Sequence, residues 1–129
     1  MRGRFLLDTS FVIDVFHGNP AARRVLSNVD EVYVPSITMG ELFSGAERSS
    51  RRAVRLAETE AFADGAEVLP CDLETARHYG AIESALRAKG RPIPDNDIWI
   101  AALAQQYELV VVTRDAHFGE VDALPVLSW

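Results

Sequence analysis

The sequence predicts a single α/β domain, residues 1–129, with a central and mainly parallel β-sheet flanked by helices. Three observations lead to this fold class. Short apolar runs typical of buried strands recur along the chain, at 4–7, 32–34, 67–69, 109–112 and more weakly 125–127. Helical patterns fill the gaps between them, as in folds whose parallel strands are joined by helices. A chain of 129 residues with neither a linker nor an internal repeat has the size of one domain.

The first half of the chain alternates strands with three recognisable helices. The strand at 4–7 leads into a helix, and Asn19-Pro20 begins another over 20–28, with asparagine as the cap and proline at the first helical position. Pro35-Ser36 begins a third helix, whose apolar residues recur at the spacing of one helical face: Met39, Leu42, Phe43 and Ala46.

The second half continues the same alternation. Residues 51–64 are rich in good helix formers. Asp72 is the expected cap of a long helix over 73–89, which ends at Gly90. Pro94 precedes a helix from about 96 to 107, with one of the polar residues 95–97 as its cap, and the core stripe of that helix is Trp99, Ile100, Leu103 and Tyr107.

Composition narrows the class of function. A formal net charge of −6 argues against broad electrostatic attraction to nucleic acid, although it does not exclude a nuclease whose acidic residues hold metal. The densest basic patch contains Arg48, Arg51, Arg52 and Arg55, and it is either a solvated helix face or a contact for RNA phosphates or an acidic partner. No apolar stretch approaches the roughly 20 residues of a membrane span. The single cysteine, Cys71, excludes an internal disulfide and fits a reducing cytoplasm.

Four carboxylates stand beside predicted strand or helix ends: Asp8, Glu41, Asp97 and Asp115. Side chains just past the carboxyl ends of adjacent parallel strands line the ligand crevice of such a sheet. Gathered there, each pair at ~4 Å would repel by roughly 4 kcal/mol at an effective dielectric constant of ~20. Hard divalent ions such as Mg²⁺ prefer oxygen ligands and would offset that repulsion. The pattern therefore predicts metal-dependent chemistry on phosphate groups.

Asp8 and Glu41 each have a purely structural alternative. Asp8 could cap the following helix, although Thr9 and Ser10 are equally good caps. Glu41 lies opposite the apolar face of its helix, so its spacing alone indicates a solvent-exposed glutamate. Two glycines on its own face cost helix stability and would leave room for close approach of a backbone, a metal shell or a substrate.

The other candidates are no less ambiguous. Asp115 could be an ordinary turn aspartate, and Asp14 is expected at the surface of its helix. The three histidines show no metal-ligand spacing and are expected at the surface or in packing contacts: His17, His78 and His117. The chain has no glycine-rich phosphate loop, HExxH zinc motif or GxSxG nucleophile motif.

Four blocks, in this order, resemble the PIN-domain ribonucleases and specifically the VapC-type toxins of bacterial toxin–antitoxin pairs. They are FLLDTS at 5–10, SITMGELFSG at 36–45, GRPIPDNDIWIAA at 90–102 and VVTRDAHF at 111–118. The resemblance covers nearly the whole chain. It implies a PIN-like domain whose sheet has the order 3-2-1-4-5, so that strands 1 and 4 are neighbours.

The resemblance also assigns roles to the acids. It places the four catalytic, metal-binding positions of the family on Asp8, Glu41, Asp97 and Asp115, and it chooses the last acid of the 95–97 group over the first. The first and third of these positions are the most regular Mg²⁺ ligands in such toxins. The polar neighbours of the site would be Thr9, Ser10 and Thr113. His117 stands where the family often has an acid.

The function implied is that of an endoribonuclease that depends on Mg²⁺ or Mn²⁺ and is the toxin of a toxin–antitoxin pair. Its partners would be RNA and a cognate VapB-type antitoxin, which would lie along the helices near 36–64 and block the acidic pocket with a basic side chain. The resemblance also implies homodimers that are joined by antitoxin, and no membrane partner is expected.

Two other classes of function fit parts of the sequence. One is a non-catalytic PIN-like module that binds RNA or protein. The presence of all four acids argues against it, because such a module would not need them. A phosphotransfer hydrolase would use Asp8 as a covalent nucleophile. That reading is disfavoured, because Ser10 stands where such enzymes carry a second aspartate and Lys89 is the only lysine.

Overall fold

The computed structural model describes residues 3–129, and the first two residues of the predicted domain lie outside the described residues. In chain order the elements are β1 (Arg4–Leu7), α1 (Thr9–Phe16), α2 (Pro20–Ser27), β2 (Glu31–Pro35), α3 (Ser36–Glu47), α4 (Arg52–Asp64), β3 (Glu67–Leu69), α5 (Leu73–Ala88), α6 (Asp95–Tyr107), β4 (Val110–Val112), the short 3₁₀ helix η1 (Ala116–Glu120) and β5 (Val126–Leu127).

The five strands form one sheet in the order β3-β2-β1-β4-β5, and every pairing between neighbours is parallel. This confirms the predicted α/β class and the predicted strand order. At the centre of the sheet Leu7 of β1 is in register with Val112 of β4. The residues that follow these two strands therefore leave the sheet side by side, at its carboxyl edge.

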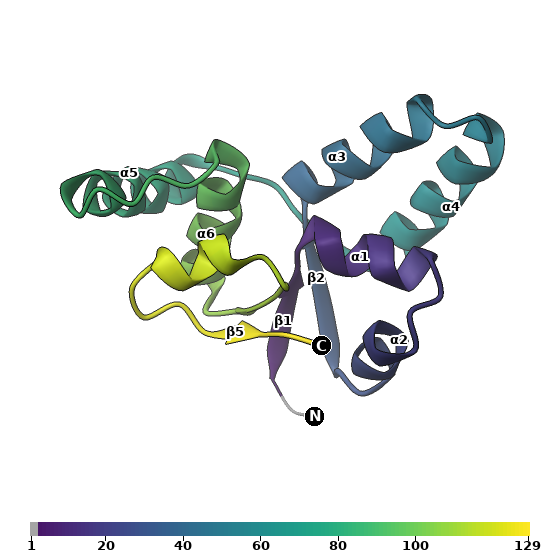
Figure 1. The fold of residues 1–129 in the computed structure, drawn as a ribbon, viewed down its shortest axis with the longest axis horizontal. Coiled ribbons are helices and arrows are strands. Elements are labelled where there is room, and N and C mark those ends of the chain that lie inside the picture. Colours follow the sequence, from purple (N-terminus) through teal and green to yellow (C-terminus); the bar gives the residue numbers. More distant parts are fainter. Residues whose placement is uncertain (1–2) are drawn as a thin grey trace.

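Both faces of the sheet are covered, and alternate side chains of the central strands enter two different cores. Leu6 and Val111 belong to the core on the side of α5 and α6. Phe5, Leu7 and Val112 belong to the core that includes α1, α2 and α3. Figure 1 shows the α5–α6 pair on one side of β1 and the helices α1 to α4 on the other.

The caps of two helices agree with the sequence prediction. The Asn19 side chain accepts a hydrogen bond from the Ala22 N–H at 3.0 Å, with Pro20 at the first helical position. Asp72 and Thr75 form a reciprocal capping box at the start of α5. The prediction for α6 is wrong in this respect, because Pro94 occupies the cap position and no side chain caps the helix.

Helix α6 is buried on more sides than a single stripe predicts. Ile100 and Leu103 are fully buried as expected, whereas Trp99 and Tyr107 are only partly buried. Small residues of the same helix are buried as well: Ala101, Ala102 and Ala104. The helix packs against α5 as well as against β4 and η1, so more than one face must be apolar and small. No helix in the described part of the chain has the length and apolarity needed to cross a membrane.

Asp14 is buried, contrary to the expectation of a surface position, and only 7% of its surface is exposed. Its carboxylate pairs with both terminal nitrogens of Arg114, at 2.9 and 3.1 Å, and accepts a hydrogen bond from the Trp129 indole at 2.8 Å. Trp129 also packs edge-on against the Phe11 ring. These contacts tie α1 to the segment after β4 and to the C-terminal residue, which no local pattern around Asp14 could indicate.

We expect Asp14→Ala to lower the free energy of unfolding by about 1–3 kcal/mol, because the partly buried indole N–H of Trp129 loses its acceptor and Arg114 loses its partner. Urea denaturation of the variant and of the wild type measures the difference. Glu60→Ala, which removes an exposed acid from α4, is the matched control. Equal stability of Asp14→Ala and this control would contradict the prediction.

Candidate metal centre

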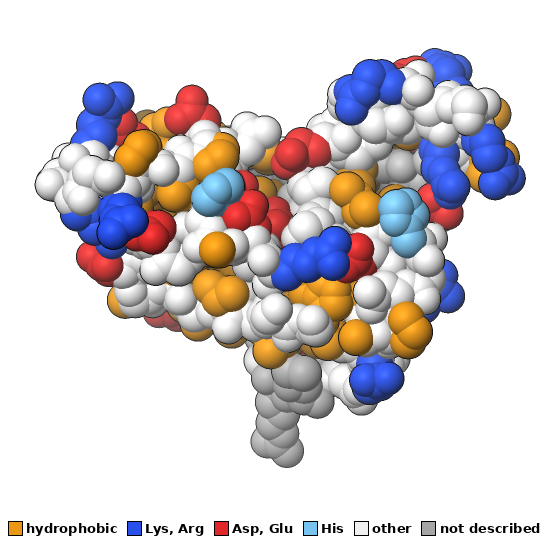
Figure 2. All heavy atoms as spheres, viewed as in Figure 1, with side chains coloured by type: hydrophobic (Ala, Val, Ile, Leu, Met, Phe, Trp, Pro, Cys, Tyr) orange, Lys and Arg blue, Asp and Glu red, His pale blue; other side chains and the backbone are white. Residues whose placement is uncertain are grey.

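Asp8 follows β1 and Asp115 follows β4 at the carboxyl edge of the sheet, Asp97 lies at the start of α6, and Glu41 lies on α3. Figure 2 shows the molecule hollowed between the α5–α6 side and the arm formed by α3 and α4, with acidic side chains gathered there and basic ones on the arm. The site is therefore built from segments that are distant in the sequence. They meet because β1 and β4 are neighbours in the sheet.

Asp8 follows β1 directly and is buried, with 5% of its surface exposed. Its backbone N–H donates to the Val112 carbonyl at 3.1 Å and so extends the pairing of β1 with β4. Its carboxylate makes no capping bond to α1. Instead, one oxygen accepts from the hydroxyl of Thr113 at 2.8 Å and from that of Ser10 at 3.1 Å. Asp8 therefore occupies the N-cap position of α1, but its side chain does not cap the helix.

The two acids at the start of α6 point to different partners. The Asp95 carboxylate accepts a hydrogen bond from the Tyr79 hydroxyl of α5 at 3.1 Å. Asp97 is turned toward the segment after β4, where one of its oxygens lies 3.0 Å from the His117 ring nitrogen Nδ1. Only 14% of the Asp97 side chain is exposed. The structure thus separates two residues that local sequence could not tell apart.

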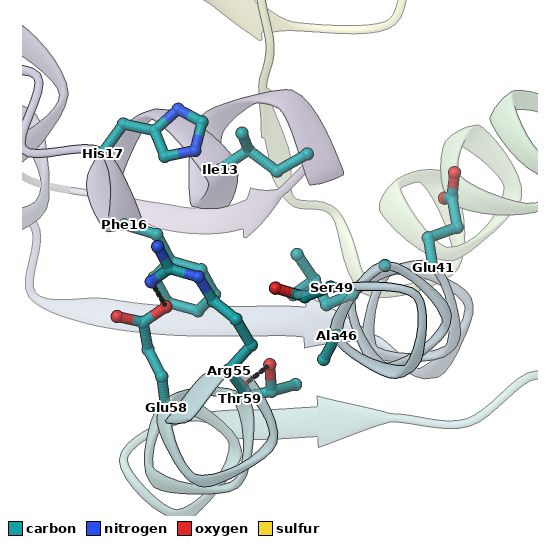
Figure 3. Close-up of a pocket in the computed structure, with 11 residues that line it drawn as sticks. Ile13, Phe16, His17, Glu41, Ala46, Ser49, Arg55, Glu58 and Thr59 are labelled. Atoms are coloured by element: carbon teal, nitrogen blue, oxygen red, sulfur yellow. Dashed lines mark hydrogen bonds and ion pairs between the residues drawn. The ribbon is translucent and has the colours of Figure 1, made fainter. Parts of the chain in front are cut away.

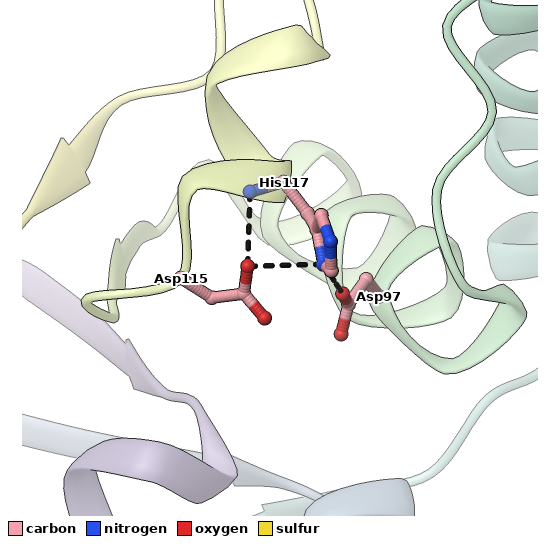
Figure 4. A group of neighbouring side chains, drawn as sticks. All are labelled: Asp97, Asp115 and His117. Atoms are coloured by element: carbon pink, nitrogen blue, oxygen red, sulfur yellow. Dashed lines mark hydrogen bonds and ion pairs between the residues drawn. The ribbon is translucent and has the colours of Figure 1, made fainter.

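Asp115 has a structural role and also faces the other acids. Its oxygen Oδ1 accepts a hydrogen bond from the His117 backbone N–H at 3.0 Å, which caps η1, as the turn interpretation expects. The same oxygen lies 2.9 Å from Nδ1 of the His117 ring. Figure 4 shows the ring between the two carboxylates. One ligand atom from each of Asp97, Asp115 and His117 lies within 4.8 Å of the others.

Glu41 lies on α3 and is exposed. Its carboxylate accepts a hydrogen bond from the Thr9 hydroxyl at 2.9 Å, which links α3 to the start of α1 beside Asp8. In Figure 3 its side chain points away from the groove between α1, α3 and α4. A Cβ built at Gly40 or Gly45 would meet no atom of another part of the chain within 4 Å. Close packing of another backbone segment is therefore not the reason for glycine at these two positions.

The mutual influence of the acids is visible at Asp97. Burial raises the pKa of its carboxyl above the ordinary value of 3.8, and the nearby charges of Asp8 and Asp115 raise it further, whereas His117 lowers it. The charges of two of the other three predicted acids therefore affect the pKa of Asp97. A cation at this place would relieve both the burial cost and the repulsion.

We expect the metal-free protein to lose thermal stability as the pH rises through neutrality. The pKa of His117 lies above its ordinary value of 6.5, chiefly because Asp97 shares a hydrogen bond with the ring. A histidine whose folded-state pKa is raised stabilises the fold fully below its unfolded pKa, and this contribution is lost as the pH rises through the folded value. Melting temperatures in a chelator at about pH 6 and about pH 8 measure the loss. An equal loss in His117→Asn would contradict the assignment.

Sequence spacing placed His117 at the surface or in a packing contact, and only the resemblance drew attention to its position. Its side chain is 48% exposed, as a surface position predicts, but its ring contacts two of the candidate acids. The available signal was its place two residues after Asp115, in the same block as a predicted site residue. The 3₁₀ turn that folds the ring back over Asp115 could not be read from that spacing.

The donor set fits a divalent cation. The carboxylates of Asp97 and Asp115 offer hard oxygen atoms of the kind that Mg²⁺ and Mn²⁺ accept, and the ring of His117 adds a nitrogen; the carboxylate of Asp8 is not among these three close ligand atoms. The arrangement does not fit a phosphotransfer hydrolase. Asp8 is buried and its carboxylate accepts hydrogen bonds from two hydroxyls. Lys89, the only lysine, pairs with Asp122 at 3.1 Å.

Comparisons with known proteins agree on one family. The PIN domain matches residues 5–124. The chain is 33% identical to the tRNA(fMet)-specific endonuclease VapC of Shigella flexneri, over 98% of each chain. It is 36% identical to ribonuclease VapC5 of Mycobacterium tuberculosis, over 91% of this chain and 87% of the relative. The crystal structure of DNA-bound VapBC from Salmonella typhimurium superposes with a TM-score of 0.89 at 33% identity, over 98% of each chain.

Proposed function

The chain belongs to the PIN domain family, and we propose that it is a divalent-metal-dependent endoribonuclease, the toxin of a toxin–antitoxin pair. The observation that carries the proposal is the group of Asp97, Asp115 and His117, together with the effect of the Asp8 charge on Asp97. Relatives that span almost the whole chain are named as ribonucleases, and one of them as a tRNA endonuclease. Such a toxin would act in the cytoplasm, where its RNA substrates are.

Within this proposal Asp8, Asp97 and Asp115 hold Mg²⁺ or Mn²⁺, and Glu41 faces the same hollow from α3. A divalent ion supplies Lewis acidity there, which activates water near neutral pH and stabilises negative charge on a phosphodiester. The chain's own contribution is to fix the donors. Thr113 and Ser10 orient the Asp8 carboxylate, and Thr9 orients that of Glu41. No serine, cysteine or lysine nucleophile is needed.

The arm formed by α3 and α4 supplies the opposite charge. Figure 2 shows basic side chains along it, above the acidic hollow. Part of this positive charge is neutralised by ion pairs within the arm, because Arg52 pairs with Glu47 and Arg55 pairs with Glu58. Arg48 donates to Ser44. We propose that this patch contacts the RNA backbone beside the bond that is cut, since phosphate contacts position a nucleic acid without reading its sequence.

A cognate antitoxin of the VapB type is the proposed protein partner. A groove of about 320 Å³ opens between α1, α3 and α4 (Figure 3), and its lining includes Ile13, of which 39% is exposed. Glu41 lies at the edge of this groove, so a segment bound there could reach the acids with a basic side chain. Homodimers joined by antitoxin are part of the same proposal, and the Salmonella typhimurium relative was solved as a VapBC complex.

Removal of metal tests the proposed function directly. We expect the purified protein to cleave RNA with Mg²⁺ or Mn²⁺, to lose the activity in a chelator and to regain it when the ion is restored. RNA binding without cleavage, together with no detectable Mn²⁺ binding, would instead identify a non-catalytic PIN-like module. Cleavage that persists undiminished in the chelator would contradict the metal-dependent mechanism.

A further inference from the structure

His117 introduces a nitrogen donor into a set that is otherwise made of oxygens. Its Nδ1 atom lies 2.9 Å from an oxygen of Asp115 and 3.0 Å from an oxygen of Asp97 (Figure 4). These are hydrogen-bond distances. They are also the spacing of neighbouring ligands around an octahedral ion, because two bonds of about 2.1 Å at a right angle place their ligand atoms about 3.0 Å apart.

The fold fixes the backbone that carries this ring. The His117 backbone N–H is bound to Asp115, within η1, and the next residue, Phe118, is fully buried in the core beneath. The His117 side chain is nevertheless 48% exposed, so part of it faces solvent. A ring held in this way can serve an ion in the hollow without any movement of the backbone.

We propose that His117 is a nitrogen ligand of the metal centre and that it makes the site select transition ions such as Mn²⁺ over Mg²⁺. This inference rests on the proposed function, because it concerns the same ion. Mg²⁺ is bound almost entirely through oxygen, whereas imidazole nitrogen is a favoured ligand of transition ions. An all-acid set would not discriminate in this way. A histidine placed among these carboxylates would therefore change which ion the site takes.

The test is electron spin-echo spectroscopy of the full chain loaded with Mn²⁺, with RNA cleavage left aside. We expect the wild type to show coupling of the Mn²⁺ spin to a ¹⁴N nucleus. His117→Asp should still bind Mn²⁺ but lose that coupling, and its ratio of Mn²⁺ to Mg²⁺ affinity should fall below that of the wild type. His117→Asn should lose the coupling as well. His78→Gln, at a histidine that is bound to Gln105 on α6, should keep it.

The outcomes separate this inference from the proposed function. Mn²⁺ binding to the wild type without ¹⁴N coupling would overturn the role of His117 and leave the nuclease proposal standing. Coupling that persists in His117→Asp, or an unchanged affinity ratio, would overturn it equally. No Mn²⁺ binding to the wild type at all would overturn both.

Discussion

Asp8→Asn should reduce metal-dependent RNA cleavage by about 10³-fold or more while leaving the fold intact. Lewis-acid stabilisation of charge is worth several kcal/mol, and each 1.36 kcal/mol corresponds to about tenfold in rate. Asp8 is the most deeply buried of the four predicted acids, and its charge acts on Asp97. The measurement is the rate of RNA cleavage at saturating Mn²⁺, together with the Mn²⁺ affinity of the variant.

The fold should survive this change because asparagine keeps the shape of the residue and an oxygen that can accept from Thr113 and Ser10. The loss of one negative charge also relieves the repulsion felt by Asp97. Asp30→Asn is the matched control, since Asp30 is exposed and precedes β2 at the opposite edge of the sheet. Full activity of Asp8→Asn would remove the basis of the nuclease proposal.

Phe118→Ala should lower the free energy of unfolding by about 3–5 kcal/mol. The ring is fully buried in the core shared by α5, α6 and η1, and deletion of a buried aromatic side chain costs this much through lost transfer energy and the cavity left behind. That is a large share of the roughly 5–15 kcal/mol that stabilises a typical domain. Because Phe118 follows His117, the candidate metal centre should loosen as well.

Chemical denaturation measures the effect on stability, and Mn²⁺ titration measures the effect on the centre. Val54→Ala is a suitable comparison, because Val54 is 47% exposed on α4 and its truncation should change stability by no more than about 0.5 kcal/mol. A loss below about 1 kcal/mol in Phe118→Ala would show that the 3₁₀ segment is not anchored by this ring.

Local patterns predicted most of the secondary structure because the forces that create them are local. Asn19 and Asp72 cap their helices as expected, since a cap depends on backbone groups only two or three residues away. The same reasoning failed at the start of α6, where three polar residues offered a cap and Pro94 took the position instead. It failed again at Asp14, whose partners Arg114 and Trp129 are about 100 residues away in sequence.

The sequence by itself determined the α/β class and indicated the candidate acids, because strand-forming runs, helix periods and motif residues are all properties of short segments. The resemblance of its four blocks supplied the strand order and the choice of Asp97 over Asp95. Only the tertiary structure decided which side chains meet. It joined Asp8 to Thr113 across the neighbouring ends of β1 and β4, turned Asp95 away toward Tyr79 and folded the His117 ring between Asp97 and Asp115. These contacts depend on the pairing of strands and on the turn of a 3₁₀ helix, which bring together residues whose local sequences carry no sign of one another.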